Sequence, residues 1–158
     1  MILSAQTIRR FCEVHNMITP FCDRTVSNGK TFGLSSAGYD VRVELAMGKL
    51  LRLGQGDFAL ASTAERFIMP NNVIGVVHDK SSWARRGLAV QNTVIEPGWA
   101  GYLTLELTNH GPDSIDLMWH DPIAQIVFHW LDHVTVQPYE GKYQNQERGP
   151  VPAIEESS

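Results

Sequence analysis

The sequence predicts a mainly β domain, a sandwich or barrel, with one helix at the N-terminus and a short helix inside the sheet region. A length of 158 residues suits one domain, and a composition of 43% hydrophobic and 19% charged residues is that of an ordinary globular protein. From Tyr39 onward the apolar residues recur mostly with a period of two, as they do in β-strands. Turn-forming residues separate these runs at regular intervals.

The first 20 residues predict the N-terminal helix. Ser4 is a suitable N-cap, and Pro20 ends the region. The side chains that recur at helical spacing are Ile8, Phe11, Cys12 and His15.

Alternation of apolar and polar side chains predicts the strands. It is clear over residues 39–44 and 103–108, and Val134 and Val136 alternate in the same way with their polar neighbours. The turn residues that bound the runs are Gly48, Gly54, Gly56, Pro70, Asn71, Asn72, Pro97, Gly98, Gly111, Pro112, Asp121 and Pro122. Many short strands at this spacing favour an all-β fold over a βαβ fold.

Residues 81–86 predict the short helix inside the sheet region, with Gly87 as its C-cap. If Ser81 and Ser82 open this helix, their hydroxyls and the free backbone N–H groups face one way and form an anion site. Arg85 would lie on the same face, one turn later. The same residues also fit a capped surface helix whose arginines are solvated.

Glu106 lies on a predicted strand that follows a tight turn at residues 96–101. It shares one strand face with Thr104 and Thr108, while the leucines at 103, 105 and 107 fill the other face. Taken alone, this pattern also fits a polar strand face in water. The polar tail after Tyr139 likewise fits a solvated chain end, and such a tail is ordered only if something holds it.

The sequence lacks several catalytic and ligand-binding motifs, and their absence argues against the classes of function that depend on them. The chain has neither the His-x-Glu nor the Pro-Cys-x-x-Cys motif of zinc-dependent nucleobase deaminases, and its two cysteines stand ten residues apart. It also lacks the Gly-rich loops that bind phosphates and dinucleotides. His129 and His133 have a spacing that binds metal on a helix, but their neighbours alternate like a strand. A formal net charge of −4 does not suggest a nucleic-acid groove.

Targeting and membrane signals are missing as well. The first residues resemble no signal peptide, and no apolar run approaches the length of a membrane span. We therefore expect a cytoplasmic protein in which Cys12 and Cys22 are free thiols.

Four stretches of the chain match, in order, the motifs of one known family. Residues 35–42 (Ser-Ser-Ala-Gly-Tyr-Asp-Val-Arg) fit a first strand motif, and residues 80–88 are similar to Arg-Ser-Ser-x-Ala-Arg-x-Gly-Leu. Residues 97–101 (Pro-Gly-Trp-x-Gly), with Leu-Glu at 105–106, fit a turn and a catalytic strand, and residues 142–146 (Lys-Tyr-x-Asn-Gln) fit a segment that covers the nucleotide. Together they resemble the dCTP deaminase branch of the dUTPase superfamily over most of the chain.

The resemblance implies a distorted, jelly-roll-like β-barrel of the dUTPase type that forms a homotrimer with sites between subunits. It implies one domain over residues 1–158, in which residues 1–20 hold the helix and residues 139–158 cover the nucleotide. The implied activity is metal-independent hydrolytic deamination of a deoxycytidine nucleotide, dCTP to dUTP and ammonia, with Mg²⁺ carried on the substrate phosphates and no zinc. Carried over by motif position, the catalytic residues are Glu106, Ser81 and Arg85, and the substrate-binding residues are Lys80, Ser82, Glu96, Trp99, Tyr139, Lys142 and Gln146.

These residue types suit the reaction. Water must add to C4 of cytosine, N3 must be protonated and ammonia must leave, so Glu106 as one carboxylate near the ring would take a proton and pass it on. Ser81 would aim the water, while Arg85 would keep Glu106 ionised and stabilise negative charge in the transition state.

Two departures from the family pattern leave the base and the number of phosphates open. Lys80 stands where the family usually has arginine, which turns a bidentate grip into a point charge. The loop at residues 91–96 is shorter than in many relatives, and Glu96 stands where aspartate is usual.

Several other functions on the same fold are alternatives to dCTP deamination. A dUTP pyrophosphatase usually shows Arg-Ser-Gly-x-Ala and a Gly-rich arm with a phenylalanine, whereas this chain has Ser82, Arg85 and a polar tail. A bifunctional enzyme that continues to dUMP, a dCMP deaminase on the same fold and a non-catalytic nucleotide-binding trimer also remain open. Release of ammonia, of pyrophosphate or of neither separates these classes.

Overall fold

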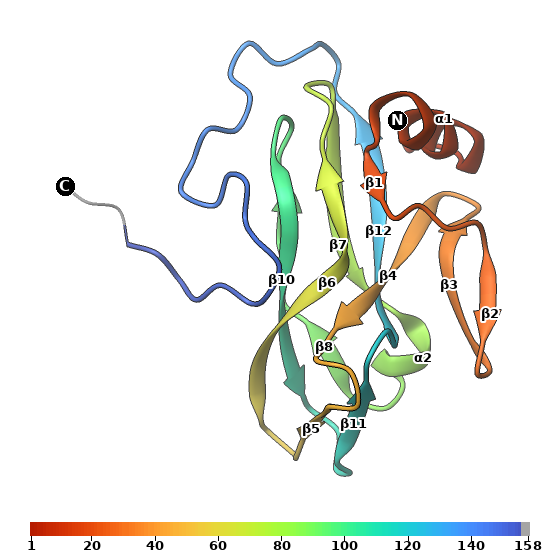
Figure 1. Cartoon of the computed structure of the whole chain (residues 1–158), viewed down its shortest axis with the longest axis vertical. Helices are drawn as coiled ribbons and strands as arrows, with labels where there is room; N and C mark the ends of the chain where they lie inside the picture. The colour runs from red at the N-terminus through yellow and green to blue at the C-terminus, as the bar shows by residue number, and fades with distance from the viewer. Residues whose placement is uncertain (156–158) are drawn as a thin grey trace.

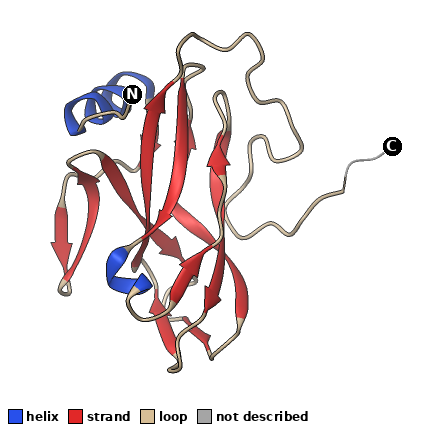
Figure 2. Cartoon of the chain, turned by 180° about the vertical axis from the view of Figure 1, so that it is seen from behind, coloured by secondary structure: helices blue, strands red, loops and turns tan. Residues whose placement is uncertain are grey.

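The computed structural model describes residues 1–155 and has the predicted mainly β architecture (Figures 1 and 2). In chain order the elements are α1 (Ala5–His15), β1 (Ile18–Thr19), β2 (Thr25–Ser27), β3 (Lys30–Ser35), β4 (Gly38–Glu44), β5 (Leu50–Leu53), β6 (Phe58–Ile68), β7 (Val73–Asp79), α2 (Ser81–Ala84), β8 (Leu88–Val90), β9 (Val94–Ile95), β10 (Ala100–Asn109), β11 (Ile115–Met118) and β12 (Pro122–Trp130).

One large sheet organises the molecule. Its path runs β8-β10-β6-β4-β12-β7-β9, with β1 added to β6, β3 to β4 and β2 to β3, while β5 and β11 form a separate pair. Each strand pair of the described chain is antiparallel. In both views α2 and the C-terminal segment lie on opposite sides of the molecule, and β10 runs beside that segment (Figures 1 and 2).

The helix α1 begins after Ser4, as predicted, but ends at His15 rather than near Pro20. Asn16 adopts a left-handed conformation with φ 52°, which ends the helix before the proline can. The Ser4 side chain makes no hydrogen bond to the helix backbone, so Ser4 is the N-cap by position alone. Of the side chains at helical spacing, Ile8 and Cys12 are buried, Phe11 is partly buried and His15 is exposed.

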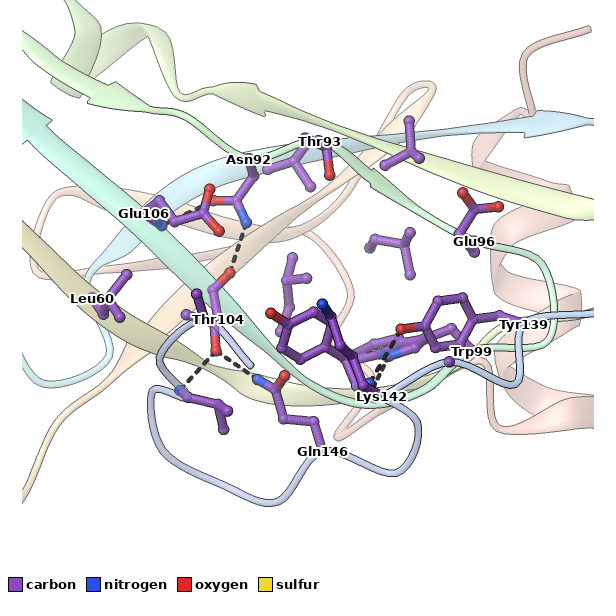
Figure 3. A pocket seen from close by; sticks show the side chains of 18 of the residues that line it. Leu60, Asn92, Thr93, Glu96, Trp99, Thr104, Glu106, Tyr139, Lys142 and Gln146 are labelled. Atoms are coloured by element: carbon purple, nitrogen blue, oxygen red, sulfur yellow. Dashed lines mark hydrogen bonds between the residues drawn. The ribbon is translucent and has the colours of Figure 1, made fainter. Parts of the chain in front are cut away.

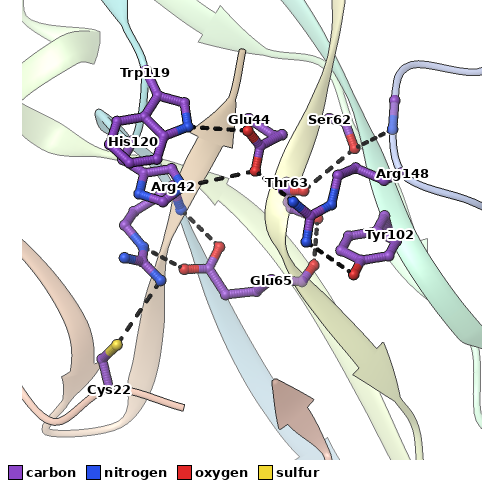
Figure 4. Close-up of polar contacts among 11 residues, drawn as sticks. Cys22, Arg42, Glu44, Ser62, Thr63, Glu65, Tyr102, Trp119, His120 and Arg148 are labelled. Atoms are coloured by element: carbon purple, nitrogen blue, oxygen red, sulfur yellow. Dashed lines mark hydrogen bonds and ion pairs between the residues drawn. The ribbon is translucent and has the colours of Figure 1, made fainter. Parts of the chain in front are cut away.

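The strand β4 is buried on both faces because it lies in the middle of the sheet. The apolar positions predicted from the alternation are fully buried at Tyr39, Val41 and Val43. The intervening Arg42 is also buried, and its Nε lies 2.7 Å from Oε1 of Glu65 on β6, whose side chain is 0% exposed (Figure 4). The backbone N–H of Arg42 donates to the second carboxylate oxygen at 3.0 Å. Alternation alone did not predict this ion pair at the centre of the sheet.

The short helix α2 is present as predicted and begins at Ser81, but it ends at Ala84 with Arg85 as its C-cap, so the predicted extent to residue 86 and the C-cap at Gly87 are wrong. Trp83 is buried and its Nε1 donates to the carbonyl of Pro122 at 2.8 Å, which anchors the helix on β12. Gly87 follows with φ +98°, and a Cβ at this position would lie 2.2 Å from the backbone nitrogen of Gly111. Glycine is therefore required where the chain leaves the helix.

The strand predicted around Val134 and Val136 is wrong. The two valines are 61% and 94% exposed, and β12 ends at Trp130. Within the described chain residues 131–138 pair with no strand, and the backbone N–H of Thr135 donates instead to the carbonyl of Asn71 at 2.9 Å. Residues 131–155 instead form an irregular tail that returns along β10 (Figure 1).

Neither α1 nor α2, the helices of residues 1–155, has the length and apolar character needed to cross a membrane. Cys12 and Cys22 are free thiols in the described chain. The cytoplasmic location stays a prediction.

Candidate active site

A cavity of about 700 Å³ lies beside β10 and brings together six of the predicted site residues. These are Glu96, Trp99, Glu106, Tyr139, Lys142 and Gln146. Figure 3 shows Glu106 at one end of the cavity, with Trp99, Tyr139 and Lys142 gathered toward the other. Apolar side chains from β6, β7 and β10 complete the walls, so the cavity offers both an apolar surface and a few polar groups, as small-molecule sites do.

Glu106 is held by the strand that carries it. Leu105 and Leu107 on either side are fully buried, so the backbone of β10 is fixed while the Glu106 carboxylate enters the cavity. Burial raises the pKa of Glu106, because the charged carboxylate loses water contacts. A raised pKa brings the carboxyl closer to the pH range in which it both accepts and releases protons.

Leu103 departs from the predicted alternation. The pairing of β10 with β6 shifts register between Tyr102 and Thr104, and Leu103 at this shift is half-buried: it packs against the core and also lines the cavity. Leu105 and Leu107 are fully buried as expected, whereas Leu103 is only half-buried and contributes an apolar side chain to the cavity that holds Glu106.

The tail is held against β10 of its own chain. Gln146 forms a parallel bridge with Gly101, and its Nε2 donates to the Tyr102 carbonyl at 2.9 Å and to Thr104 Oγ1 at 2.6 Å. Gly101 has φ +146°, and a Cβ there would lie 2.7 Å from the Gln146 nitrogen. The close approach of tail and strand therefore depends on glycine at position 101.

Sequence analysis missed Gln144, which fastens the same tail. Its Nε2 donates to the carbonyls of Gly98 and Tyr139, both at 2.9 Å, and its Oε1 accepts the N–H of Ala100 at 2.8 Å. The motif that predicted residues 142–146 leaves position 144 unspecified, so no sequence signal marked it. The amide thus joins the tail to the turn that precedes β10.

The residues around α2 form a second polar group, apart from the cavity. Lys80 forms an ion pair with Asp40 in the described chain, and the second oxygen of Asp40 accepts a hydrogen bond from Gln125 Nε2 at 3.2 Å. Ser82 and Arg85 are exposed. The motif predicts Lys80 as a phosphate-binding cation and does not indicate its contact with Asp40, or that of Asp40 with Gln125.

One chain does not bring the two groups together. None of Lys80, Ser81, Ser82 and Arg85 lines the cavity that holds Glu106. Burial accounts for the raised pKa of Glu106, and no charge on α2 contributes to it. The predicted contact between Arg85 and Glu106 is therefore not made within a single chain over the described residues.

Comparison with known proteins identifies the family. A family model described as dCTP deaminase-like matches residues 40–131. A dCTP deaminase of Campylobacter lari is 34% identical over 176 residues, which cover 93% of this chain and 95% of that protein. The chain belongs to the dCTP deaminase-like family. A dCTP deaminase of Gemmatimonas aurantiaca is 33% identical over 182 residues and covers 97% and 99% of the two chains.

The dCTP deaminase-like membership confirms the resemblance inferred from the motifs. Both alignments are longer than this chain of 158 residues, so the two relatives carry segments that it lacks. The predicted dUTPase-type fold is confirmed by solved structures: a dUTPase of Staphylococcus bacteriophage 80alpha superposes with a TM-score of 0.56 at 14% identity over 80% of this chain and 97% of that one. The native dUTPase of EIAV gives 0.51 at 23% identity over 66% and 94%.

Proposed function

We propose that this chain is a hydrolytic deaminase that converts a deoxycytidine nucleotide, dCTP in the first instance, to the deoxyuridine nucleotide and ammonia. The observation that carries the proposal is a carboxylate, Glu106, with a raised pKa inside a cavity that is walled by apolar side chains and bordered by the tail. Membership of the dCTP deaminase-like family supports the same substrate.

Glu106 would act first as a base and then as an acid. Its carboxylate takes a proton from water while the oxygen bonds to C4, and it gives that proton to N3 of the ring. It next moves the remaining proton of the new C4 hydroxyl to the amino group, so that the C4–N bond breaks and ammonia leaves. One water is consumed and one ammonia released, and Glu106 returns to its starting state.

The α2 group would complete the site from a neighbouring subunit of a homotrimer. Two observations support this: Ser81 and Arg85 are exposed, and they lie apart from Glu106 in one chain. In a neighbour's cavity Ser81 would aim the attacking water, and Arg85 would stabilise the negative charge that develops during the addition. Lys80, Ser82, Tyr139, Lys142 and Gln146 would hold the phosphates and the sugar.

Magnesium would enter on the substrate. Mg²⁺ prefers oxygen ligands and is often bound largely through substrate phosphates, so its binding here requires no cage of protein ligands. Among the described residues no group of three or more histidine, cysteine, aspartate or glutamate side chains is placed to hold a metal ion. Lys142, the one basic side chain among the residues that line the cavity, would neutralise part of the remaining phosphate charge.

Product analysis tests the proposal. Purified protein is incubated separately with dCTP, dCMP, CTP and dUTP in the presence of Mg²⁺, and ammonia and pyrophosphate are measured. We expect ammonia from dCTP, no pyrophosphate from dUTP and much slower turnover of CTP. Pyrophosphate from dUTP without ammonia from dCTP would replace the proposal by a pyrophosphatase, and both products from dCTP would indicate a bifunctional enzyme. Ammonia from dCMP alone would make the monophosphate the substrate.

The tail would act as a lid over the nucleotide, and Gln144 offers a specific test. Gln144→Met keeps the length of the side chain but removes its hydrogen bonds to Gly98, Ala100 and Tyr139, each of which contributes about 0.5–1.5 kcal/mol. We expect the KM for dCTP to rise at least several-fold and trypsin to cleave faster at Lys142 and Arg148. Glu147→Ala, an exposed neighbour, is the control and should leave both measurements unchanged. Wild-type KM and wild-type proteolysis in Gln144→Met would show that this amide does not hold the lid.

A further inference from the structure

Asn92 makes two hydrogen bonds that flank Glu106. It lies on the loop between β8 and β9 and lines the cavity (Figure 3). Its Oδ1 accepts the backbone N–H of Glu106 at 3.1 Å, and its Nδ2 donates to the backbone carbonyl of Thr104 at 2.6 Å. One side chain thus binds the strand on both sides of Leu105.

These two hydrogen bonds continue the ladder along β10 beyond the point where its pairing with β8 ends. The pairing of β8 with β10 ends at Val90 opposite Leu107, and the Gln91 N–H makes the last backbone contact, to the Glu106 carbonyl at 2.8 Å. Beyond this point the N–H of Glu106 and the carbonyl of Thr104 face the loop. A half-buried backbone group without a partner is costly, and the Asn92 amide supplies one acceptor and one donor in the places that a further peptide group would occupy.

The loop is also tied on its far side. The backbone carbonyl of Thr93 accepts the N–H of Val77 on β7 at 3.4 Å. The loop therefore connects β7 to β10 beside the cavity, and Asn92 and Gln91 both attach it to the strand that carries Glu106. Loss of the Asn92 amide would leave Gln91 as the link between the loop and β10, and the edge of β10 at Thr104 and Glu106 would be held by its pairing with β6 alone.

We propose that Asn92 is a positioning residue, which fixes the backbone of β10 so that the Glu106 carboxylate meets the attacking water and the ring nitrogen. This role rests on the proposed deaminase function. Asparagine is suited to the position because it offers a donor and an acceptor on one short side chain. Aspartate lacks the donor for Thr104, and alanine lacks both groups.

Two substitutions separate positioning from mere support of the fold. Asn92→Ala should lower kcat for dCTP about ten- to a hundred-fold with a smaller change in KM, because a small displacement of a catalytic group slows the chemical step. Asn92→Asp should lower kcat as well, and in addition raise the pKa of Glu106, since a second carboxylate disfavours the charged form. The acid limb of the kcat profile would then move to higher pH. The other titratable groups that line the cavity are Glu96, Tyr139, Lys142 and Tyr143.

Asn109 provides a matched control on the same strand. It is fully buried, and its Nδ2 donates to the carbonyls of Leu53 and Asp113 at 3.0 and 2.8 Å, outside the cavity. Asn109→Ala should reduce stability but leave kcat per folded molecule and the pH profile as in the wild type. Circular dichroism and gel filtration establish the folded fraction of each variant.

NMR titration of the Glu106 carboxyl gives a readout that does not depend on turnover. A higher pKa in Asn92→Asp than in the wild type is the expected result, together with the loss of kcat in both Asn92 variants. Wild-type kcat in Asn92→Ala, or an unchanged Glu106 titration in Asn92→Asp, would overturn the positioning role. If the wild-type protein releases no ammonia, the deaminase function fails instead, and the titration still tests the coupling of the two side chains.

Discussion

Replacement of Glu106 by glutamine is expected to lower kcat for dCTP by about a thousand-fold, within the range that general acid–base catalysis contributes. Glutamine keeps the size of the side chain but cannot accept the proton of the attacking water. Nucleotide binding should therefore stay within a few-fold of the wild type. Single-turnover ammonia release and equilibrium binding of dCTP measure the two effects separately.

Glu96→Gln is the matched control, because Glu96 lies in the same cavity and is proposed to bind the substrate. Its effect should fall mainly on KM. The pH profile gives a second check: the base form of Glu106 is ionised, and burial raises its pKa, so activity should rise with pH through a midpoint above that of an exposed glutamate. Near-normal turnover in Glu106→Gln would remove Glu106 from the mechanism.

Replacement of Glu65 by alanine is expected to destabilise the fold by about 3–5 kcal/mol, because it leaves the Arg42 guanidinium buried without its partner. A protein of this size is typically stable by about 5–15 kcal/mol, so the variant would keep a small margin or none. Chemical denaturation measures the free energy of unfolding, and all variants are compared at one protein concentration because subunit association makes apparent stability concentration-dependent.

The exposed ion pair of Arg52 and Asp116 is the control for the buried pair of Arg42 and Glu65. Arg52 binds Asp116 through two hydrogen bonds of 2.6 and 2.7 Å, but the two side chains are 64% and 42% exposed. Asp116→Ala should cost far less than Glu65→Ala, since water solvates and screens exposed charges. The double variant Arg42→Met with Glu65→Leu should recover much of the loss, because neither charge then remains buried. Equal losses at the exposed and the buried pair would show that burial is not the cause.

The sequence predicted the parts of the fold that depend on local patterns. Period-two alternation placed β4 and β10, and the serine signal placed the start of α2, whereas the helix ends three residues before Gly87, which lies in the turn that follows. The same rule failed at Val134 and Val136, because alternation states only which side chains share a face and not whether a partner strand exists. The helix α1 ends at His15 because Asn16 adopts a left-handed conformation. The proline at position 20 had predicted a later end.

The candidate site was predicted in part. Motif order identified the six predicted residues that meet in the cavity, although Glu106 and Lys142 are 36 positions apart in the chain. Asn92, Gln144 and Glu65 could not be found in this way, because each acts through a backbone or a side chain that only the folded sheet brings close. The separation of Arg85 from Glu106 also needed the structure, since a linear motif does not say whether two of its residues meet within one chain.

The side of β10 that faces the loop and the tail is covered in three pieces: by β8 near Asn109, by the Asn92 amide between Thr104 and Glu106, and by the returning tail at Gly101. An uncovered strand invites pairing with a strand of another molecule, which is a common route to aggregation. If the tail lifts whenever nucleotide enters or leaves, each turnover briefly bares a length of β10. Solubility during long incubations would then depend on how tightly the tail closes, and saturating nucleotide should protect the protein from precipitation.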